Sequence, residues 1–422
     1  LSPDEGAWRL MGWAAGGFGP ALVRAVRSAE GASVERLAWV LAHAVAQGGA
    51  REVPSEAAAP CADAGHGTGR DLAAAHRRCH RPPGSGTSTP AISSSVSSDA
   101  RSSGARPVRP PIPGLADVQA VTSDEVLRWR DLPASLIVIG AGAIGAELAQ
   151  ALGRLGVAVT WVMRGPRPLR GDGAEAGETI LRVASAEGVR VVTGAHDMRV
   201  EPCRSGVRVQ WEGGEAEAAH LLLAAGREPN LEGLDAEAGG VELDRGGIRV
   251  DAQGRTTRAR TWAIGDAVGG AHLAYQFTHV ATWEGPLVAE NCIAGREHVM
   301  DHAAMPRVTF TDPEVASVGL NEATALERGH DPLVHVKLVR EIGKARALGV
   351  TEGLVKIVLD RATGHLLGAT IVAPHAGDML PELTMPLHDG GDLRTLLATV
   401  HPHPTLSEAV KVAVREAVAR IG

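Results

Sequence analysis

The sequence predicts an α/β fold followed by a separate α+β domain, and three observations support this. Residues 135–140, SLIVIG, form a continuous apolar run rich in β-branched side chains, as expected for a strand buried in a parallel sheet. A helical pattern, AIGAELAQALGRLG, and a second apolar run, VAVTWVM, follow directly, so strand, helix and strand occur in succession. From Met305 onward, β-rich segments such as RVTFTD and LVKIVLD are followed by helices, which indicates a second domain.

The amino-acid composition argues against some classes of function for this protein. With 422 residues, 44% hydrophobic and 22% charged, the chain suits a soluble protein of several domains. A net charge of −7 without any basic run argues against a nucleic-acid partner. We expect no membrane partner, because no apolar run is long enough to span a bilayer and no signal peptide is visible from Leu1. Four scattered cysteines fit a reducing cytosol and a cytoplasmic location: Cys61, Cys79, Cys203 and Cys292.

Residues 1–103 differ in character from the rest of the chain. Their first half contains apolar residues at helical spacing, and the pattern then dissolves into a tract rich in Ser, Pro and Gly. This tract has no sustained strand or helix period, so it is interpreted as low-complexity or disordered sequence. Residues 1–103 are therefore left unassigned.

The loop between the first two predicted strands carries Gly140, Gly142 and Gly145 in G-x-G-x-x-G spacing. The first glycine permits a tight turn, the second lets the backbone approach a pyrophosphate, and the third lets helix pack on strand. Unpaired N–H groups at the start of the following helix favour phosphate binding. Because the motif lies between a predicted strand and a predicted helix, it predicts a Rossmann-type dinucleotide site.

The end of the second predicted strand bears on the choice of nucleotide. An NAD site usually has an acidic residue there, which accepts hydrogen bonds from the ribose. This chain has Met163 and then Arg164, with Arg167 and Arg170 close behind. Guanidinium groups suit a 2′-phosphate, so NADPH is favoured over NADH, with a solvated basic loop as the alternative. Glu147, near the helix start, is a candidate cofactor contact, although a structural or helix-dipole role is favoured.

Further motifs follow in a definite order. They are GARPVRPPIPG (104–114), AAGREPN (224–230, including Gly226), RTWAIGDAVGG (260–270), PRVTFTDPEVASVGL (306–320) and HPHPTLSE (401–408). Together with GAGAIGAELA, they resemble the pyridine nucleotide-disulfide oxidoreductases, the group that includes dihydrolipoyl dehydrogenase, glutathione reductase and mercuric reductase. The resemblance covers residues 104–422, roughly three quarters of the chain.

The resemblance implies a Rossmann-type NAD(P)-binding domain inserted in an FAD-binding domain whose N-terminal part is missing or replaced, plus a C-terminal α+β dimerisation domain. The implied boundaries are an FAD-domain remnant with its crossover at 104–134, the NAD(P)-binding domain at 135–232, a central FAD-binding segment at 233–300 and the interface domain at 301–422. FAD and NADPH are the implied cofactors, and a homodimer through the C-terminal domain is the implied assembly.

The resemblance also implies roles for two further sets of residues. Asp266, after Gly265, would accept a hydrogen bond from the ribityl chain of FAD, with a surface-turn aspartate as the alternative. His403 and Glu408 would form a general acid–base pair serving a redox disulfide of the other subunit. The alternative is a helix-capping PTLSE segment with an incidental histidine. The C-terminal cysteine pair of mercuric reductases is absent, since the last cysteine is Cys292.

Residues 1–103 lack three features that the resemblance implies: a first G-x-G-x-x-G for FAD, an acidic residue after the next strand, and a C-x-x-x-x-C redox pair. Cys61 and Cys79 lie eighteen positions apart and do not supply that pair. Cys203 and Cys292 are expected to be packing residues. We hypothesise that residues 1–103 are a replaced or out-of-frame N-terminus joined to an oxidoreductase body.

The sequence thus predicts an FAD-dependent NAD(P)H disulfide oxidoreductase. Hydride would pass from NADPH to flavin, and electrons then to a disulfide or similar small-molecule acceptor, with activity impaired where C-x-x-x-x-C is missing. Two alternatives stay open. One is a non-catalytic dinucleotide-binding or interaction protein with residues 1–103 as a docking module, and the other is a flavin reductase using an acceptor such as a quinone or oxygen.

Overall fold

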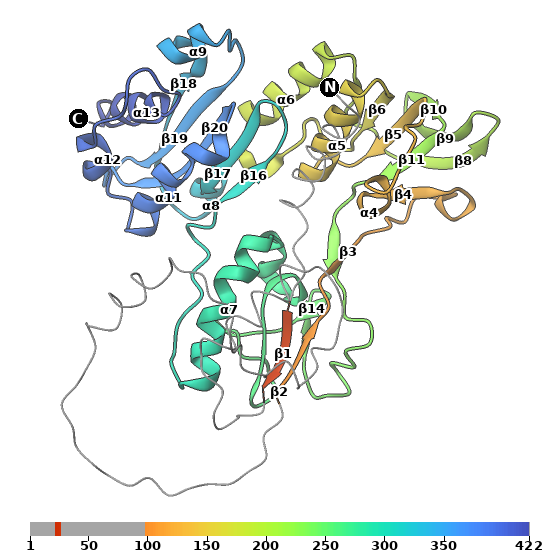
Figure 1. Ribbon diagram of the computed structural model, residues 1–422, viewed down its shortest axis with the longest axis horizontal. Helices are drawn as coiled ribbons and strands as arrows, with labels where there is room; N and C mark the ends of the chain where they lie inside the picture. Colours follow the sequence, from red (N-terminus) through yellow and green to blue (C-terminus); the bar gives the residue numbers. More distant parts are fainter. Residues whose placement is uncertain (1–21, 27–97, 422) are drawn as a thin grey trace, which may run out of the picture.

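The computed structural model describes residues 22–26 and 98–421. The helical and low-complexity patterns within residues 1–97, together with Cys61 and Cys79, lie outside the described residues. Figure 1 shows three parts: a part built on a parallel sheet (orange to yellow-green), a central part (mainly green to teal) and a C-terminal part (teal to blue). None of the helices in the described ranges is long and apolar enough to cross a membrane.

A five-stranded parallel sheet forms the first of these parts, the parallel-sheet part, and confirms the predicted α/β class. The strand order is β4-β11-β5-β6-β7. The strands are β4 (Ala120–Thr122), β5 (Ser135–Ile139), β6 (Ala158–Val162), β7 (Arg190–Val192) and β11 (His220–Leu223). The helices are α4 (Ser123–Val126), α5 (Ala143–Arg154) and α6 (Ala174–Ala186).

Strand β5 is apolar throughout because both faces of the sheet are covered. Leu136 and Val138 pack under α5 and α6, whereas Ile137 and Ile139 pack against an antiparallel sheet on the opposite face. That second sheet consists of β8 (Arg199–Cys203), β9 (Gly206–Trp211) and β10 (Gly214–Ala218). Cys203 ends β8 at the hairpin, is partly buried and has its Sγ atom 3.0 Å from the hydroxyl of Ser205.

The central part is connected to the parallel-sheet part by a two-stranded antiparallel ladder, in which β3 enters and β12 returns. The ladder consists of β3 (Ala105–Pro107) and β12 (Arg227–Pro229). The central part contains β13 (Leu243–Asp244), β14 (Gly247–Ile248), β15 (Thr261–Ala263), η3 (Gly265–Ala267), η4 (Gly270–Tyr275) and α7 (Thr278–Ile293). Strands β1 (Leu22–Val26) and β2 (Ser98–Ser102) extend β15 into a small antiparallel sheet.

The C-terminal part is an antiparallel sheet with helices, as expected for the α+β domain. The strand order is β16-β17-β20-β19-β18, and α13 packs on β18 and β19. Its strands are β16 (Arg307–Thr309), β17 (Glu314–Gly319), β18 (Pro332–Leu338), β19 (Leu354–Asp360) and β20 (Leu366–Ala373). Its helices are α8 (Glu322–Glu327), α9 (Gly343–Ala347), α10 (Ala376–Met379), α11 (Pro381–His388), α12 (Arg394–Ala398) and α13 (Glu408–Val418).

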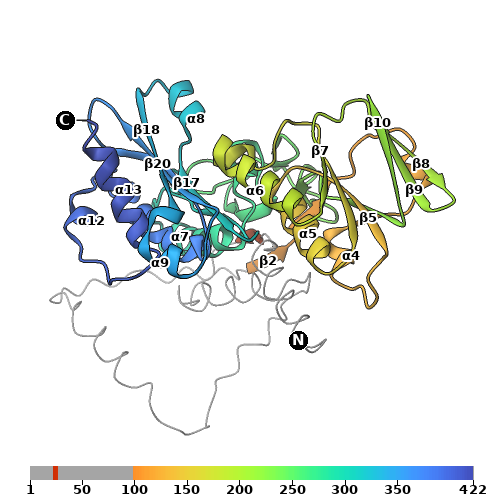
Figure 2. The ribbon, with the colours of Figure 1, turned by 90° about the horizontal axis from the view of Figure 1, so that it is seen from above.

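Helix α6 lies between the parallel sheet and the C-terminal sheet (Figures 1 and 2). Its buried Ile180 belongs to the same apolar cluster as Leu354 and Val372 of the C-terminal part. The ammonium group of Lys356 is almost fully buried and donates to both carboxylate oxygens of Glu175, at 2.9 and 2.8 Å. Shared apolar packing and a paired buried charge therefore join the two parts.

Candidate functional site

The glycine-rich turn between β5 and α5 depends on glycine at two positions for steric reasons. Gly140 has a φ of +142°, and a Cβ added there would lie 2.0 Å from the carbonyl oxygen of Ala224. A Cβ on Gly145 would lie 2.5 Å from the carbonyl oxygen of Gly140. The turn and the close packing of helix on strand therefore exclude larger residues at these two positions.

Gly142 differs from its two neighbours in the motif because a Cβ added there would meet nothing within 4 Å. It is the N-cap residue of α5 and has no side-chain cap, so the first N–H groups of the helix have no side-chain partner from this position. The open space above Gly142 and the helix N-terminus together can admit a phosphate group directly against the backbone.

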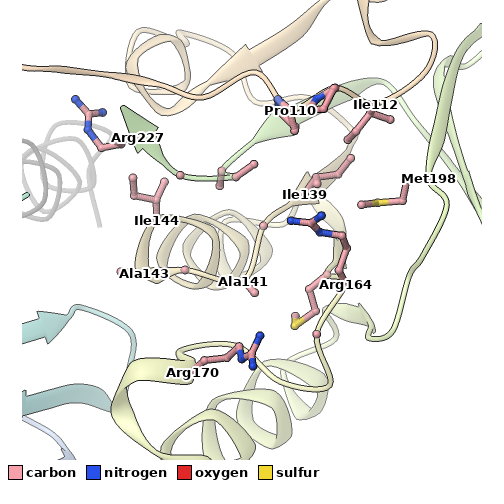
Figure 3. A pocket seen from close by; sticks show the side chains of 18 of the residues that line it. Pro110, Ile112, Ile139, Ala141, Ala143, Ile144, Arg164, Arg170, Met198 and Arg227 are labelled. Atoms are coloured by element: carbon pink, nitrogen blue, oxygen red, sulfur yellow. The ribbon is translucent and has the colours of Figure 1, made fainter. Parts of the chain in front are cut away.

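These residues line a cavity of about 1250 Å³ (Figure 3). Its wall includes Gly140, Gly142, Glu147, Arg164, Arg170 and Gly226, all of which were candidates from sequence, whereas Gly145 is buried behind the turn. Further wall residues come from 110–113, within the GARPVRPPIPG motif, and from two segments that no motif had marked, 196–199 and 273–277. Asp197 is the acidic residue of the second segment and has a left-handed φ of +50°.

The three arginines after β6 have different surroundings. Arg164 and Arg170 are exposed and line the cavity, and Figure 3 shows Arg164 extending beside the glycine-rich turn. Arg167 is not among the lining residues. It packs against α6 beside Gly177, where an added Cβ would come 3.3 Å from Arg167 Cδ. The cavity therefore receives two guanidinium groups from this loop.

Glu147 lines the cavity and also contacts the C-terminal part. Its Oε1 atom accepts a hydrogen bond of 2.8 Å from the backbone N–H of Phe310. Burial raises the pKa of Glu147 to about 7, although this hydrogen bond opposes the rise. The hydrogen bond supports the structural role that the sequence favoured, and the carboxyl group is half-buried at the cavity wall.

Asp266 lies in η3 directly after β15 and is 1% exposed. Its Oδ1 atom is buried and has no hydrogen-bond partner among the described residues. Burial raises the pKa of Asp266 to about 7, Arg227 opposes the rise, and the nearby charge of Glu284 adds to it. A buried carboxylate oxygen without a partner is costly, so this position suits a ligand that donates a hydroxyl hydrogen bond. The surface-turn alternative for Asp266 is wrong.

His403 and Glu408 lie on the turn that leads into α13, away from the cavity wall. His403 Nδ1 is 2.9 Å from Glu408 Oε1, and Glu408 Oε2 accepts a hydrogen bond of 2.9 Å from the N–H of Thr405. These hydrogen bonds hold the pKa of Glu408 below its usual value, with that from His403 contributing most. One carboxylate thus both orients the histidine and closes the turn. His403 itself is 77% exposed and is available to an outside partner.

Sequence reasoning missed a second histidine pair in the same segment. His401 Nε2 lies 2.7 Å from Oε2 of Glu382 in α11, and the His401 side chain is 8% exposed. The signal was the first histidine of HPHPTLSE, but its partner is nineteen residues away and could not be inferred from local spacing.

Two family models match the chain. The model of the pyridine nucleotide-disulphide oxidoreductases matches residues 102–285, and that of their dimerisation domain matches residues 305–414. Among curated relatives, a mercuric reductase of Bacillus cereus is 37% identical over 318 residues, which is 74% of this chain and 49% of the relative. A dihydrolipoyl dehydrogenase of Chlorobaculum tepidum is 38% identical over 319 residues, 74% of this chain and 67% of the relative.

Solved structures agree with these matches. The HOCl-induced flavoprotein disulfide reductase RclA from Escherichia coli has a TM-score of 0.68 at 27% identity, covering 76% of this chain and 72% of that chain. This chain spans about half to two thirds of the length of the curated relatives it matches. The fold, the ordered motifs and both family models lead to one conclusion: the chain belongs to the pyridine nucleotide-disulphide oxidoreductase family.

Proposed function

We propose that this protein is an FAD-dependent NAD(P)H oxidoreductase that delivers electrons to a disulfide or a similar small-molecule acceptor. The observation that carries the proposal is the cavity of about 1250 Å³ around the glycine-rich turn, whose wall includes Gly142 at the start of α5 and the exposed Arg164 and Arg170. A relative that is 38% identical is a dihydrolipoyl dehydrogenase, and another that is 37% identical is a mercuric reductase.

The residues around Asp266 fit a flavin. The buried Oδ1 atom of Asp266 has no hydrogen-bond partner among the described residues, and a ribityl hydroxyl could donate to it. Bound FAD would accept a hydride at its isoalloxazine ring and release electrons to the acceptor. Asp266 would hold the ribityl chain in place, and the buried Glu284, which accepts a hydrogen bond of 2.7 Å from the N–H of Gly265, would hold the Asp266 turn.

The nicotinamide cofactor would be NADPH. Arg164 and Arg170 are positioned to pair with a 2′-phosphate, and no acidic residue ends β6. Gly142 and the start of α5 would receive the pyrophosphate, and Gly226, with a φ of +122° and nothing within 4 Å of an added Cβ, would let the dinucleotide pass close to the backbone. Asp197 also lines the cavity, and an aspartate is a usual ribose partner of NADH. Comparing the rates of flavin reduction by NADPH and by NADH therefore decides between the two cofactors.

Proton transfer would fall to His403 and Glu408. Glu408 orients His403 through Nδ1, which leaves Nε2 to give or take a proton at the acceptor. His403 is exposed on its own protomer and lies outside the cavity wall. We therefore propose that it acts at the active site of a second subunit, in a homodimer formed through the C-terminal domain.

A flavin reductase with a non-disulfide acceptor is the second candidate, and one observation favours it. Cys203 lies at the β8–β9 hairpin, Cys292 lies in the last turn of α7, and neither lines the cavity. Within the described ranges, no cysteine is therefore placed to relay electrons from this cavity.

The decisive experiment uses the purified full-length chain reconstituted with FAD. Under anaerobic conditions, NADPH should bleach the flavin absorbance, and NADH should do so more slowly. Subsequent turnover with lipoamide or glutathione disulfide would support the disulfide route, whereas turnover only with a quinone would support the second candidate. A protein that binds neither FAD nor NADPH would be a non-catalytic member and would overturn both.

A further inference from the structure

Two histidines and a buried glutamate converge in the central part, outside the proposed nucleotide cavity. Glu284 is in α7, His272 is in η4, and His302 lies in the segment that follows α7. Their ligand-type atoms, one from each side chain, all lie within 4.8 Å of one another. Glu284 Oε1 is 2.7 Å from His302 Nε2 and 3.2 Å from His272 Nε2.

Hydrogen bonds within the cluster of His272, Glu284 and His302 leave one imidazole nitrogen without a partner among the described residues. One carboxylate oxygen faces two imidazole nitrogens, and Oε2 of the same carboxylate is already occupied by the N–H of Gly265. His302 makes a hydrogen bond to Oε1. His272 Nε2 lies within ion-pair distance of Oε1 but lacks the angle for a hydrogen bond, and it has no other partner among the described residues. A histidine that is 9% exposed is thus left with an unpaired nitrogen facing a carboxylate.

Aromatic side chains surround the cluster on the His302 side. Tyr275 stacks on His302 with ring centroids 4.8 Å apart, and Trp283 contacts the same ring edge-on at 5.5 Å. His302 is 15% exposed, which leaves a route from solvent.

We propose that His272, Glu284 and His302 bind a divalent first-row transition-metal ion, with Zn²⁺ as its representative, through the two Nε2 atoms and Oε1. The proposal does not depend on the nucleotide or flavin sites. Three protein ligands from imidazole and carboxylate, with a water completing the set, are a common arrangement for Zn²⁺. The set contains no sulfur, so it suits Zn²⁺, Cu²⁺ or Co²⁺ rather than soft ions such as Cu⁺.

The distances are close to those that a bound ion requires. With metal–ligand bonds of roughly 2.0–2.1 Å, tetrahedral ligands lie about 3.3 Å apart. The observed separations run from 2.7 Å to at most 4.8 Å, so small rotations of the side chains would bring all three atoms onto one ion. The ion would also replace the hydrogen bond between His302 and Glu284, and so relieve the unpaired nitrogen of His272.

The site would stabilise the turn that carries Asp266. Glu284 uses Oε2 to hold the N–H of Gly265, the residue before Asp266. An ion on Oε1 would fix the orientation of this carboxylate, and therefore of the turn, in the way that outer-shell partners orient metal ligands. Metal occupancy is then expected to raise the thermal midpoint of the full-length protein.

The test is metal titration of the full-length chain after chelator treatment. Addition of Co²⁺ should produce visible d–d absorption of a low-symmetry site, and Zn²⁺ should displace it and raise the thermal midpoint, while Mg²⁺ should do neither. His272→Gln should weaken Co²⁺ binding by at least roughly tenfold. This variant is informative because His272 Nε2 makes no hydrogen bond whose loss would unfold the protein.

A matched control is available nearby. His298 Nε2 lies 2.6 Å from Oε2 of Glu290, at the C-terminal end of α7, in a similar pair that has no third ligand among the residues the structure describes. His298→Gln should retain full Co²⁺ affinity and the Zn²⁺-dependent thermal shift, whereas His302→Gln should lose both. Two outcomes would overturn the proposal: absence of the d–d absorption in the unmodified chain, or equal weakening in the His298 and His272 variants.

Discussion

His403 Nδ1 and Glu408 Oε1 lie 2.9 Å apart across the turn before α13, and the same carboxylate accepts the N–H of Thr405. The pair is therefore held by its own turn, independently of any partner subunit. Because the His403 side chain is 77% exposed, its ring is accessible to a group from outside its own surroundings. Four predictions follow from this and the other geometries.

Replacing either member of the pair should affect the second half-reaction alone. His403→Gln and Glu408→Gln are expected to slow turnover with a disulfide acceptor by about 10²-fold, while the anaerobic reduction of flavin by NADPH stays within about twofold. Stopped-flow and steady-state rates measure the two separately. His330→Gln is the control, because His330 forms a similar 3.0 Å pair with Asp360 at an unrelated site. Equal slowing of flavin reduction would contradict the assignment.

The cavity arginines should determine cofactor choice. Arg164→Ala and Arg170→Ala are each expected to raise the KM for NADPH by roughly 10–100-fold, the worth of a hydrogen bond to a charged group, with little change for NADH. Arg167→Ala is the matched control from the same loop, since Arg167 does not line the cavity. If the affinities of the protein for NADPH and for NADH fall equally, the arginines do not contact the 2′-phosphate.

Substitutions at Gly140 and Gly142 should separate an effect on stability from an effect on nucleotide binding. A Cβ at position 142 meets nothing within 4 Å, so Gly142→Ala should fold with a thermal midpoint near that of the unmodified chain but bind NADPH weakly. Gly140→Ala places its Cβ 2.0 Å from the oxygen of Ala224 at a φ of +142°, so it should lower the stability by several kcal/mol. Calorimetry and nucleotide titration check both. Normal NADPH affinity in Gly142→Ala would argue against the pyrophosphate position.

The flavin-free protein should lose stability as the pH rises. Burial raises the pKa of Asp266 to about 7 from an ordinary value near 3.8. A group whose pKa is higher in the folded state binds a proton on folding, so its contribution is present at low pH and lost as the pH rises towards 7, by up to about 4 kcal/mol. Glu147, with a pKa raised to about 7, acts in the same direction.

Unfolding midpoints of flavin-free protein between pH 5 and pH 8 measure this effect. Asp266→Asn cannot lose a proton, so it should flatten part of the pH dependence, and the double variant with Glu147→Gln should flatten more of it. FAD should also reduce the dependence, because a hydroxyl donor would stabilise the ionised Asp266. An unchanged slope in Asp266→Asn would show that Asp266 ionises freely in the folded protein.

Local sequence patterns were sufficient to predict the elements that neighbouring residues in the chain determine. The apolar run of β5 and the glycines of the following turn appear in the structure where the residues indicated them. The pairing of His403 with Glu408 was also accessible, because both residues belong to one turn. In these cases steric limits, hydrophobic burial or a five-residue spacing decide the outcome within a few residues of chain.

The chain alone therefore determined the glycine-rich turn, because short-range sterics and strand burial specify it, and the order of its motifs carried the resemblance to the family. Only the tertiary structure decided which arginines reach the cavity, since Arg167 packs on α6 while Arg164 and Arg170 do not. It also brought together His272, Glu284 and His302. Glu284 lies in α7 and His272 lies in η4, and both of these elements contact η3. No spacing along the chain specifies how such elements meet.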